Sequence, residues 1–196
     1  PDVDYVTVER AVEGGKTEKL ILAKALLEKV FRDEEVKVVD TFKGKKLKGQ
    51  KYHPLFTFLP PDKPAHFVVL GEFVTTEDGS GLVHMAPAFG AEDMQAALEF
   101  DLPVLMTVLP DGTFIPEVTP WRGVFVKDAD PLIILDLDAR GLLFRTEKIT
   151  HTYPFCWRCK TPLLYYAREA WYIRTSQFKE RLVELNRTIH WTPDHI

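Results

Sequence analysis

Residues 79–93 read GSGLVHMAPAFGAED, and the hydrophobic pattern changes in the middle of this stretch. Its first half predicts a short strand over 82–86, because apolar residues dominate there and a glycine-rich turn precedes them. Its second half opens a pattern with a period near 3.6, which predicts a helix over 91–100. The stretch therefore predicts a strand, a short loop and a helix in direct succession.

Two polar side chains flank the predicted loop. His84 lies near the end of the strand, and Asp93 lies in the first turn of the helix. Because helical side chains lean toward the N-terminus of their helix, we expect the Asp93 carboxylate to project over the loop. From spacing alone a simpler interpretation is favoured. In it, Asp93 only complements the helix dipole, a contribution of about 0.3 to 1 kcal/mol, and His84 is an ordinary strand histidine.

Short strands are predicted along most of the remaining chain. They share apolar or β-branched content and cover 3–8, 34–42, 66–74, 103–108, 123–127 and 142–153. No regular alternation of strands with helices occurs, which argues against a doubly wound sheet. The sequence therefore predicts an α+β domain with a barrel-like mixed β-sheet.

Three further helices are predicted. Over 18–31 a strand passes into a short helix. A second helix covers 131–140, where Asp130 suits the N-cap, Pro131 the first helical position and Gly141 the end. A last helix opens at Ser176, with Phe178, Leu182 and Leu185 expected to face inward.

Composition limits the class of function. The 196 residues carry 25 basic and 29 acidic side chains, a net charge of −4, so any contact with RNA must be local. A hydrophobic content of 45% excludes a disordered chain, and no apolar run reaches the roughly 18 residues that a membrane span needs. EGGKT at 13–17 and DGSGL at 78–82 lack the spacing of a phosphate loop and of a nucleophile elbow. Only two cysteines and no signal peptide predict a reducing, cytoplasmic compartment.

A lysine-rich run, KGKKLKGQK at 43–51, places five lysines in nine residues. Such a run meets RNA phosphates where local positive charge is needed. It is more often the solvated surface of an exposed hairpin. Because no aromatic residue interleaves before Tyr52, the hairpin interpretation is favoured.

CWRCKTP at 156–162 has the form of a zinc knuckle, because the thiolates of Cys156 and Cys159 are spaced to reach one tetrahedral ion at about 2.3 Å. A full site needs two more ligands. His151 is the nearest imidazole, and the sequence holds no second cysteine pair. A thioredoxin-type redox pair is the alternative, but Pro162 predicts a turn into a strand and not the helix that such a pair opens. Half of a structural zinc site is therefore favoured, with the other half outside this sequence.

Three segments together resemble the editing domain of isoleucyl-tRNA synthetases, the large insertion called the connective peptide. They are GSGLVHMAPAFGAED at 79–93, THTYPFCWRCKTPLLYYA at 150–167, and AWYIRTSQF at 170–178 followed by IHWTPDHI at 189–196. The resemblance covers essentially the whole chain in order. Leucyl and valyl enzymes share the glycines and the final aspartate of the first segment, whereas His84 followed by an Ala-Pro pair is similar to the isoleucyl type.

The resemblance implies hydrolysis of valine from tRNA(Ile). One methylene gives only modest discrimination, so a second site must remove the smaller product, and the isoleucyl enzyme is itself the standard example of this limit. The resemblance implies that Asp93 is catalytic by anchoring the α-ammonium group of the misattached amino acid. It implies that His84 lies beside the aminoacyl and terminal adenosine groups and helps to exclude isoleucine. Phe89 and Gly90 are expected to offer backbone groups to the adenosine.

The resemblance also implies an organisation for the chain. It is the editing fold shared by class I valyl, isoleucyl and leucyl enzymes, with a body over 1–150, half of a zinc ribbon over 151–168 and a segment over 169–196 that returns toward a catalytic domain. The partners implied are the acceptor end of tRNA(Ile) and its valyl or isoleucyl group, with no membrane. Because the sequence begins at Pro1 without an initiator methionine, we expect it to be part of a longer protein.

Several family signatures are absent from this sequence. They are the threonine-rich editing loop of the type WTTTPW, the His-any-Gly-His tetrad and the KMSKS loop. The resemblance therefore implies that ligation of isoleucine to tRNA(Ile), with ATP and magnesium, occurs in the catalytic domain of a monomeric, cytoplasmic parent. It further implies that the second cysteine pair of the zinc site lies upstream.

Two alternatives stay open. One is a non-catalytic tRNA-docking module built from the knuckle and the lysine run at 43–51, which would bind acceptor ends without preference for the aminoacyl group. The other is the editing domain of a valyl- or leucyl-tRNA synthetase, for which the amino acid removed would decide.

Overall fold

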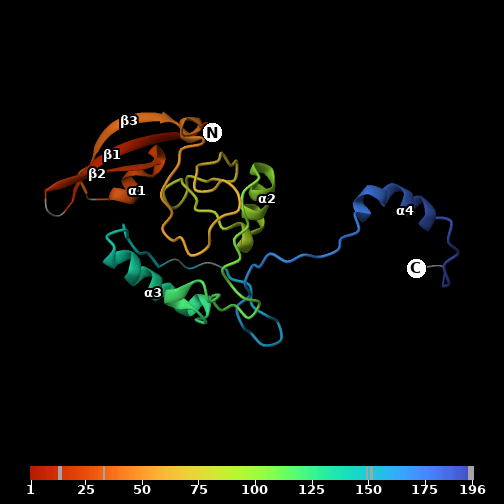
Figure 1. Cartoon of the computed structure of the whole chain (residues 1–196). Coiled ribbons are helices and arrows are strands. Elements are labelled where there is room, and N and C mark those ends of the chain that lie inside the picture. The colour runs from red at the N-terminus through yellow and green to blue at the C-terminus, as the bar shows by residue number, and fades with distance from the viewer. Residues whose placement is uncertain (13–14, 33, 149, 151, 194–196) are drawn as a thin grey trace.

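The computed structural model describes residues 1–12, 15–32, 34–148, 150 and 152–193 (Figure 1). Its sheet has the strand order β2-β1-β3, with both pairs antiparallel, and consists of β1 (Asp4–Val12), β2 (Lys16–Ala23) and β3 (Lys37–Lys43). The α-helices of the described residues are α1 (Leu27–Phe31), α2 (Ala91–Phe100), α3 (Val126–Ala139) and α4 (Lys179–Asn186). The strands form one antiparallel sheet near the start of the chain, and three of the four helices follow it, which agrees with the α+β class.

The central strand β1 serves two hydrophobic clusters, because successive side chains of a strand point to opposite faces of the sheet. Val6 and Val8, both fully buried, pack with Phe31 from α1. Tyr5 packs on the other cluster with Leu47, which comes from the turn after β3. Each fully buried apolar side chain of this size contributes about 1.5 to 3 kcal/mol. The two clusters therefore hold the three strands and α1 together, and β2 leads into α1 as the sequence predicts.

Most of the other predicted strands do not form. The segment over 66–74 makes one isolated bridge, between Phe67 and Lys51, and the region after α2 makes others, such as Val108 with Phe114. Four further predicted strands are also not formed in the described residues, where they make isolated bridges at most. They are the segments 82–86, 103–108, 123–127 and 142–153. Apolar, β-branched content indicates burial but does not supply a hydrogen-bonding neighbour. The described sheet is thus open and antiparallel, in place of the barrel-like mixed sheet that the sequence predicts.

Two helices agree with the sequence in different degrees. Helix α2 has the predicted bounds and ends at Asp101, which adopts a positive φ of 51°. Helix α3 begins five residues before the predicted start, so that Pro131 lies inside the helix and Asp130 is no cap. Pro131 is the sixth residue of the helix, where its missing N–H removes one helical hydrogen bond. Gly141 follows the helix with φ of +65°, as a terminating glycine does.

The last helix is displaced from the rest of the molecule. Figure 1 shows α4 at the end of an extended segment, away from the sheet and from α3. The side chains of Phe178 and Leu182 are 53% and 52% exposed, so the prediction that they face inward is wrong. The helical period identifies an apolar stripe but not what covers it. None of the helices within the described ranges is long and apolar enough to cross a membrane.

Candidate functional site

The Asp93 carboxylate folds back over the loop that precedes α2. Its Oδ2 accepts a hydrogen bond from the backbone N–H of Ala86, at 3.0 Å, and the side chain is half-buried. A methyl group on Gly90 would lie 2.6 Å from that same oxygen. Because Gly90 has no side chain, the carboxylate has room to reach across the loop. The projection expected from helix geometry is confirmed.

A short 3-10 turn over Pro87–Phe89 forms the floor of this loop. The N–H of Phe89 donates to the carbonyl of Ala86 at 2.8 Å, and the N–H of Met94 donates to the carbonyl of Gly90 at 2.9 Å. The Phe89 N–H is therefore used within the loop. No hydrogen bond from the Gly90 N–H is found among the described residues.

A distant segment braces the loop from outside. The N–H of Ala167 donates to the carbonyl of Ala88 at 2.7 Å, and the ring of Tyr166 meets that of Phe89 at 6.1 Å between centroids. The Tyr166 hydroxyl donates in turn to the carbonyl of Val108 at 3.0 Å. Nothing in the sequence pattern indicates that Tyr166 and Ala167 contact this loop, although they follow the cysteine motif closely.

The start of the 79–93 stretch is fixed on the sheet. The Tyr5 hydroxyl donates to the carbonyl of Gly81 at 2.6 Å, and the Ala23 N–H donates to the carbonyl of Ser80 at 2.8 Å. Gly81 adopts φ of +76°, and a methyl group there would lie 2.5 Å from the side chain of Ala23. Both the backbone conformation and the close approach therefore require glycine. The loop is anchored on β1 and β2 at one end and on α2 at the other.

His84 lies on the connecting segment, which is not a strand, and its side chain is exposed. It stands two residues before Ala86, whose N–H holds Asp93. The structure thus brings the backbone of the histidine segment to the Asp93 carboxylate. That the two side chains converge on one pocket stays a prediction.

The cysteine motif forms a tight turn. The N–H of Cys156 donates to the carbonyl of Thr161 at 2.8 Å, and Phe155 pairs with Pro162 as an antiparallel bridge. Cys159 lies within the turn, and no helix begins at the motif. The predicted turn is confirmed, but among the described residues the segment after it is not the predicted strand and makes only this one bridge.

The Cys159 thiol is acidified by its surroundings. Its sulfur lies 3.0 Å from the hydroxyl of Thr161. Hydrogen bonds to the thiolate, from that hydroxyl first, then from the Thr161 backbone and the Cys156 thiol, lower the pKa of Cys159 to about 7. Thiolate is the form that binds zinc. His151 lies outside the described residues, and these contain no group of three or more potential metal-binding side chains. That Cys156 and Cys159 are two of the four ligands of a structural zinc site stays a prediction.

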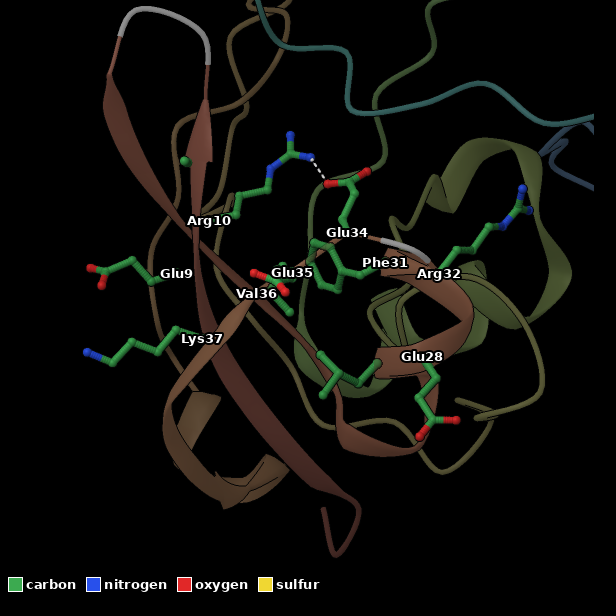
Figure 2. Close-up of a pocket in the computed structure, with 11 residues that line it drawn as sticks. Glu9, Arg10, Glu28, Phe31, Arg32, Glu34, Glu35, Val36 and Lys37 are labelled. Carbon is green, nitrogen blue, oxygen red and sulfur yellow. Dashed lines mark hydrogen bonds and ion pairs between the residues drawn. The ribbon is translucent and has the colours of Figure 1, made fainter.

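Two surface cavities lie elsewhere. The larger, of about 590 Å³, is bounded by β1, α1 and β3, and Figure 2 shows the Arg10 guanidinium directed at Glu34 across it. Arg10 pairs with Glu34 at 2.9 Å and also with Glu18, so its charge is already neutralised. The smaller, of about 290 Å³, is lined by aromatic rings that include Trp121 and by Arg140. Neither cavity is lined by His84 or Asp93.

No family model matches the chain. Curated proteins do match it closely. An isoleucine-tRNA ligase of Clostridium acetobutylicum is 50% identical over 193 residues, which is 98% of this chain and 18% of that protein. The isoleucine-tRNA ligase of Streptomyces coelicolor is 44% identical over 196 residues, 100% of this chain and 18% of that protein. The one of Thermus thermophilus is 45% identical over 179 residues, 91% of this chain and 17% of that protein.

The chain is homologous to a segment of isoleucine-tRNA ligases. It spans about 18% of the length of the first relatives, and the match to the Streptomyces protein extends over 100% of this chain. The resemblance drawn from the three sequence segments is thereby confirmed at the level of the family. In this chain the loop held by Asp93 and the cysteine turn are connected through the contacts of Tyr166 and Ala167.

Proposed function

We propose that the chain is part of the editing domain of an isoleucine-tRNA ligase and that it takes part in hydrolysis of valyl-tRNA(Ile). The observation that carries the proposal is the position of the Asp93 carboxylate, held over the loop by the Ala86 N–H. A carboxylate that only complements a helix dipole needs no such hydrogen bond. Its fixed orientation supports a role in binding.

The ligand for this carboxylate is the α-ammonium group of the misattached amino acid. Only Oδ2 of Asp93 has a hydrogen-bond partner in the described part of the chain, which leaves Oδ1 to accept from the ammonium. Such a bond is charge-assisted and is about twice as strong as a neutral one. Aminoacyl groups that lack a free amine would lose it, so Asp93 selects for an aminoacyl-tRNA.

The reaction needs little beyond positioning. In the substrate an ester joins the aminoacyl carbonyl to the terminal ribose. Water attacks the carbonyl carbon, the bond to the ribose oxygen breaks, and that oxygen leaves with a proton from the water as the free amino acid forms. Because the ester is already activated, a fixed ammonium group and a positioned water are sufficient without a covalent nucleophile. We expect the N–H of Gly90 to contact the adenosine.

His84 is proposed to select valyl over isoleucyl groups and to lie near the terminal ribose. Its exposed imidazole stands on the segment that carries Ala86, on the approach to the loop. We expect it to border a pocket that admits a valyl side chain and excludes the larger isoleucyl one. An imidazole there also offers a hydrogen bond near the leaving ribose oxygen.

The cysteine turn is proposed to form half of a structural zinc site, with Cys156 and Cys159 as ligands and a second pair supplied by another part of the parent. The metal would be structural and supplies no chemistry to the ester. The parent's other properties are also proposals: isoleucylation of tRNA(Ile) with ATP and magnesium in a separate catalytic domain, and a cytoplasmic location. The identity to isoleucine-tRNA ligases supports the isoleucyl branch over the valyl and leucyl ones.

Deacylation of valyl-tRNA(Ile) tests the proposal, with the chain alone and with an added threonine-rich segment. Asp93→Ala should abolish hydrolysis in whichever form is active. Glu92→Ala is the matched control, because Glu92 is an exposed carboxylate in the same first turn of α2. An equal loss of deacylation in both variants would show that Asp93 only complements the helix dipole. Binding of acceptor ends regardless of the aminoacyl group, with no hydrolysis in either form, would favour the docking module.

A further inference from the structure

The lysine run at 43–51 lies in a long stretch without negative charge. Residues 41–61 include five lysines and no aspartate or glutamate, in a chain whose net charge is −4. A cationic surface on an otherwise acidic protein directs anionic partners to one place. The structure shows how these lysines are held.

The run is not the exposed hairpin that the sequence favours. It forms a 3-10 turn over Gly44–Leu47, in which Leu47 is only 5% exposed and packs beside Tyr5. The backbone is fixed on both sides, since the Gly44 N–H donates to the carbonyl of Val3 at 2.9 Å and the Gly49 N–H to that of Val68 at 2.8 Å. The buried leucine and these bonds hold the lysines on a fixed surface.

Ion pairs divide the five lysines into two groups. Lys43 pairs with Asp4 at 2.9 Å, and Lys46 pairs with Asp40 at 3.0 Å. The side chains without an acidic partner among the described residues are exposed, and they are Lys45, Lys48 and Lys51. These three retain their full charge toward solvent.

One side chain connects this turn to the candidate site. A methyl group on Gly44 would lie 2.8 Å from the ring of Tyr5, so the ring packs directly under the turn. The hydroxyl of the same tyrosine donates to the carbonyl of Gly81, where the 79–93 stretch begins. The lysine turn and the stretch that leads to Asp93 therefore both contact Tyr5.

We propose that Lys45, Lys48 and Lys51 form a docking surface for the phosphate backbone of the RNA strand whose 3′ end enters the Asp93 loop. The inference rests on the proposed function, because it takes the aminoacylated RNA end as the ligand of that loop. Lysine ammonium groups bind phosphates as point charges and need no base sequence. Tyr52, which is 47% exposed and follows Lys51, adds an aromatic surface of the kind on which single-stranded bases stack.

Binding of uncharged tRNA(Ile) to the chain, measured across a range of salt concentrations, tests this surface. The test variant replaces all three unpaired lysines by glutamine. The control variant makes the same charge change at the far end of the sheet, in Lys16, Lys19 and Lys37. For single strands each phosphate contact adds about 0.7 to the slope of log K against log[salt], so the test variant should lose a slope of about 2. Between 50 and 200 mM salt the unmodified chain should therefore lose about 20-fold more affinity than the test variant.

The control variant should keep the salt slope of the unmodified chain. A variant with arginine at all three lysine positions should also have the slope of the unmodified chain. Equal slopes in the test and control variants would overturn the inference, as would the absence of measurable tRNA binding by the unmodified chain. A far-UV circular dichroism spectrum that matches the parent's shows that the test variant is folded. Because uncharged tRNA is used, a failure here is distinct from a failure of Asp93→Ala in the deacylation assay, which concerns the proposed function alone.

Discussion

Gly90→Ala isolates the contact that positions the Asp93 carboxylate. Gly90 has φ of −146° and ψ of 136°, an extended conformation that alanine adopts readily. The added methyl group, however, would lie 2.6 Å from Oδ2 and 2.9 Å from Cγ of Asp93. The carboxylate must therefore rotate away and release the Ala86 N–H.

The magnitude follows from the bond that is lost. A hydrogen bond to a charged group contributes about 1.5 to 3 kcal/mol, and this one is only half-buried, so the lower end applies. Restricting the unfolded chain by replacing glycine with alanine returns about 0.4 to 1 kcal/mol. The net loss in the free energy of unfolding should be about 1 kcal/mol. Deacylation should fall much further, because the ammonium anchor is displaced.

Urea denaturation of a double-mutant cycle measures this effect. In an Asp93→Ala background the carboxylate is absent, so Gly90→Ala should become neutral or slightly stabilising. The reasoning is refuted if Gly90→Ala lowers the free energy of unfolding by the same amount in both backgrounds, since the methyl group would then act on something other than Asp93.

Three further outcomes are expected. Tyr5→Phe removes the hydroxyl that holds the start of the loop and leaves a buried carbonyl unpaired, so urea denaturation should show a loss of about 1 to 3 kcal/mol. Val6→Ala removes two methyl groups from a side chain that is 0% exposed and should lower the free energy of unfolding by about 2 kcal/mol, whereas Val39→Ala, at a 40% exposed position, should cost much less. Alkylation of Cys159 by iodoacetamide in the metal-free chain should reach half its maximal rate near pH 7, because its lowered pKa makes thiolate available there. Thr161→Val should move that midpoint upward, and an unchanged midpoint would show that the hydroxyl is not the cause.

Local rules predicted those parts of the chain whose partners are close in sequence. Helix α2 depends on bonds four residues apart, and both its bounds and the direction of Asp93 follow from helical geometry. The cysteine turn is equally local, since Cys156 bonds to Thr161 within the same motif. Strands depend on a neighbour elsewhere in the chain, and the segment over 66–74 has an apolar pattern but only one bridge. A pattern of burial is therefore a poor guide to sheet pairing.

The anchors of the candidate site were beyond sequence reasoning for the same reason. Tyr5 and Gly81 are separated by 76 positions, and nothing in the pattern of β1 distinguishes a tyrosine that bonds to a distant carbonyl from one that only fills the core. A glycine in the sequence indicates that a positive φ or a close approach is possible, and Gly81 has both. The sequence does not indicate which residue approaches it.

The contacts of Tyr166 and Ala167 connect the proposed zinc turn to the Asp93 loop. Ala167 lies eight positions after Cys159 and bonds to Ala88 in the floor of the loop. Beyond it the chain is extended, and Trp171 is fully exposed, so nothing further along the described segment holds these two residues in place. Their position therefore depends on their own few bonds and on whatever fixes the cysteine turn. In the proposed function, binding of zinc by Cys156 and Cys159 would cross-link that turn, and a loop that distinguishes one methylene would need support of that rigidity.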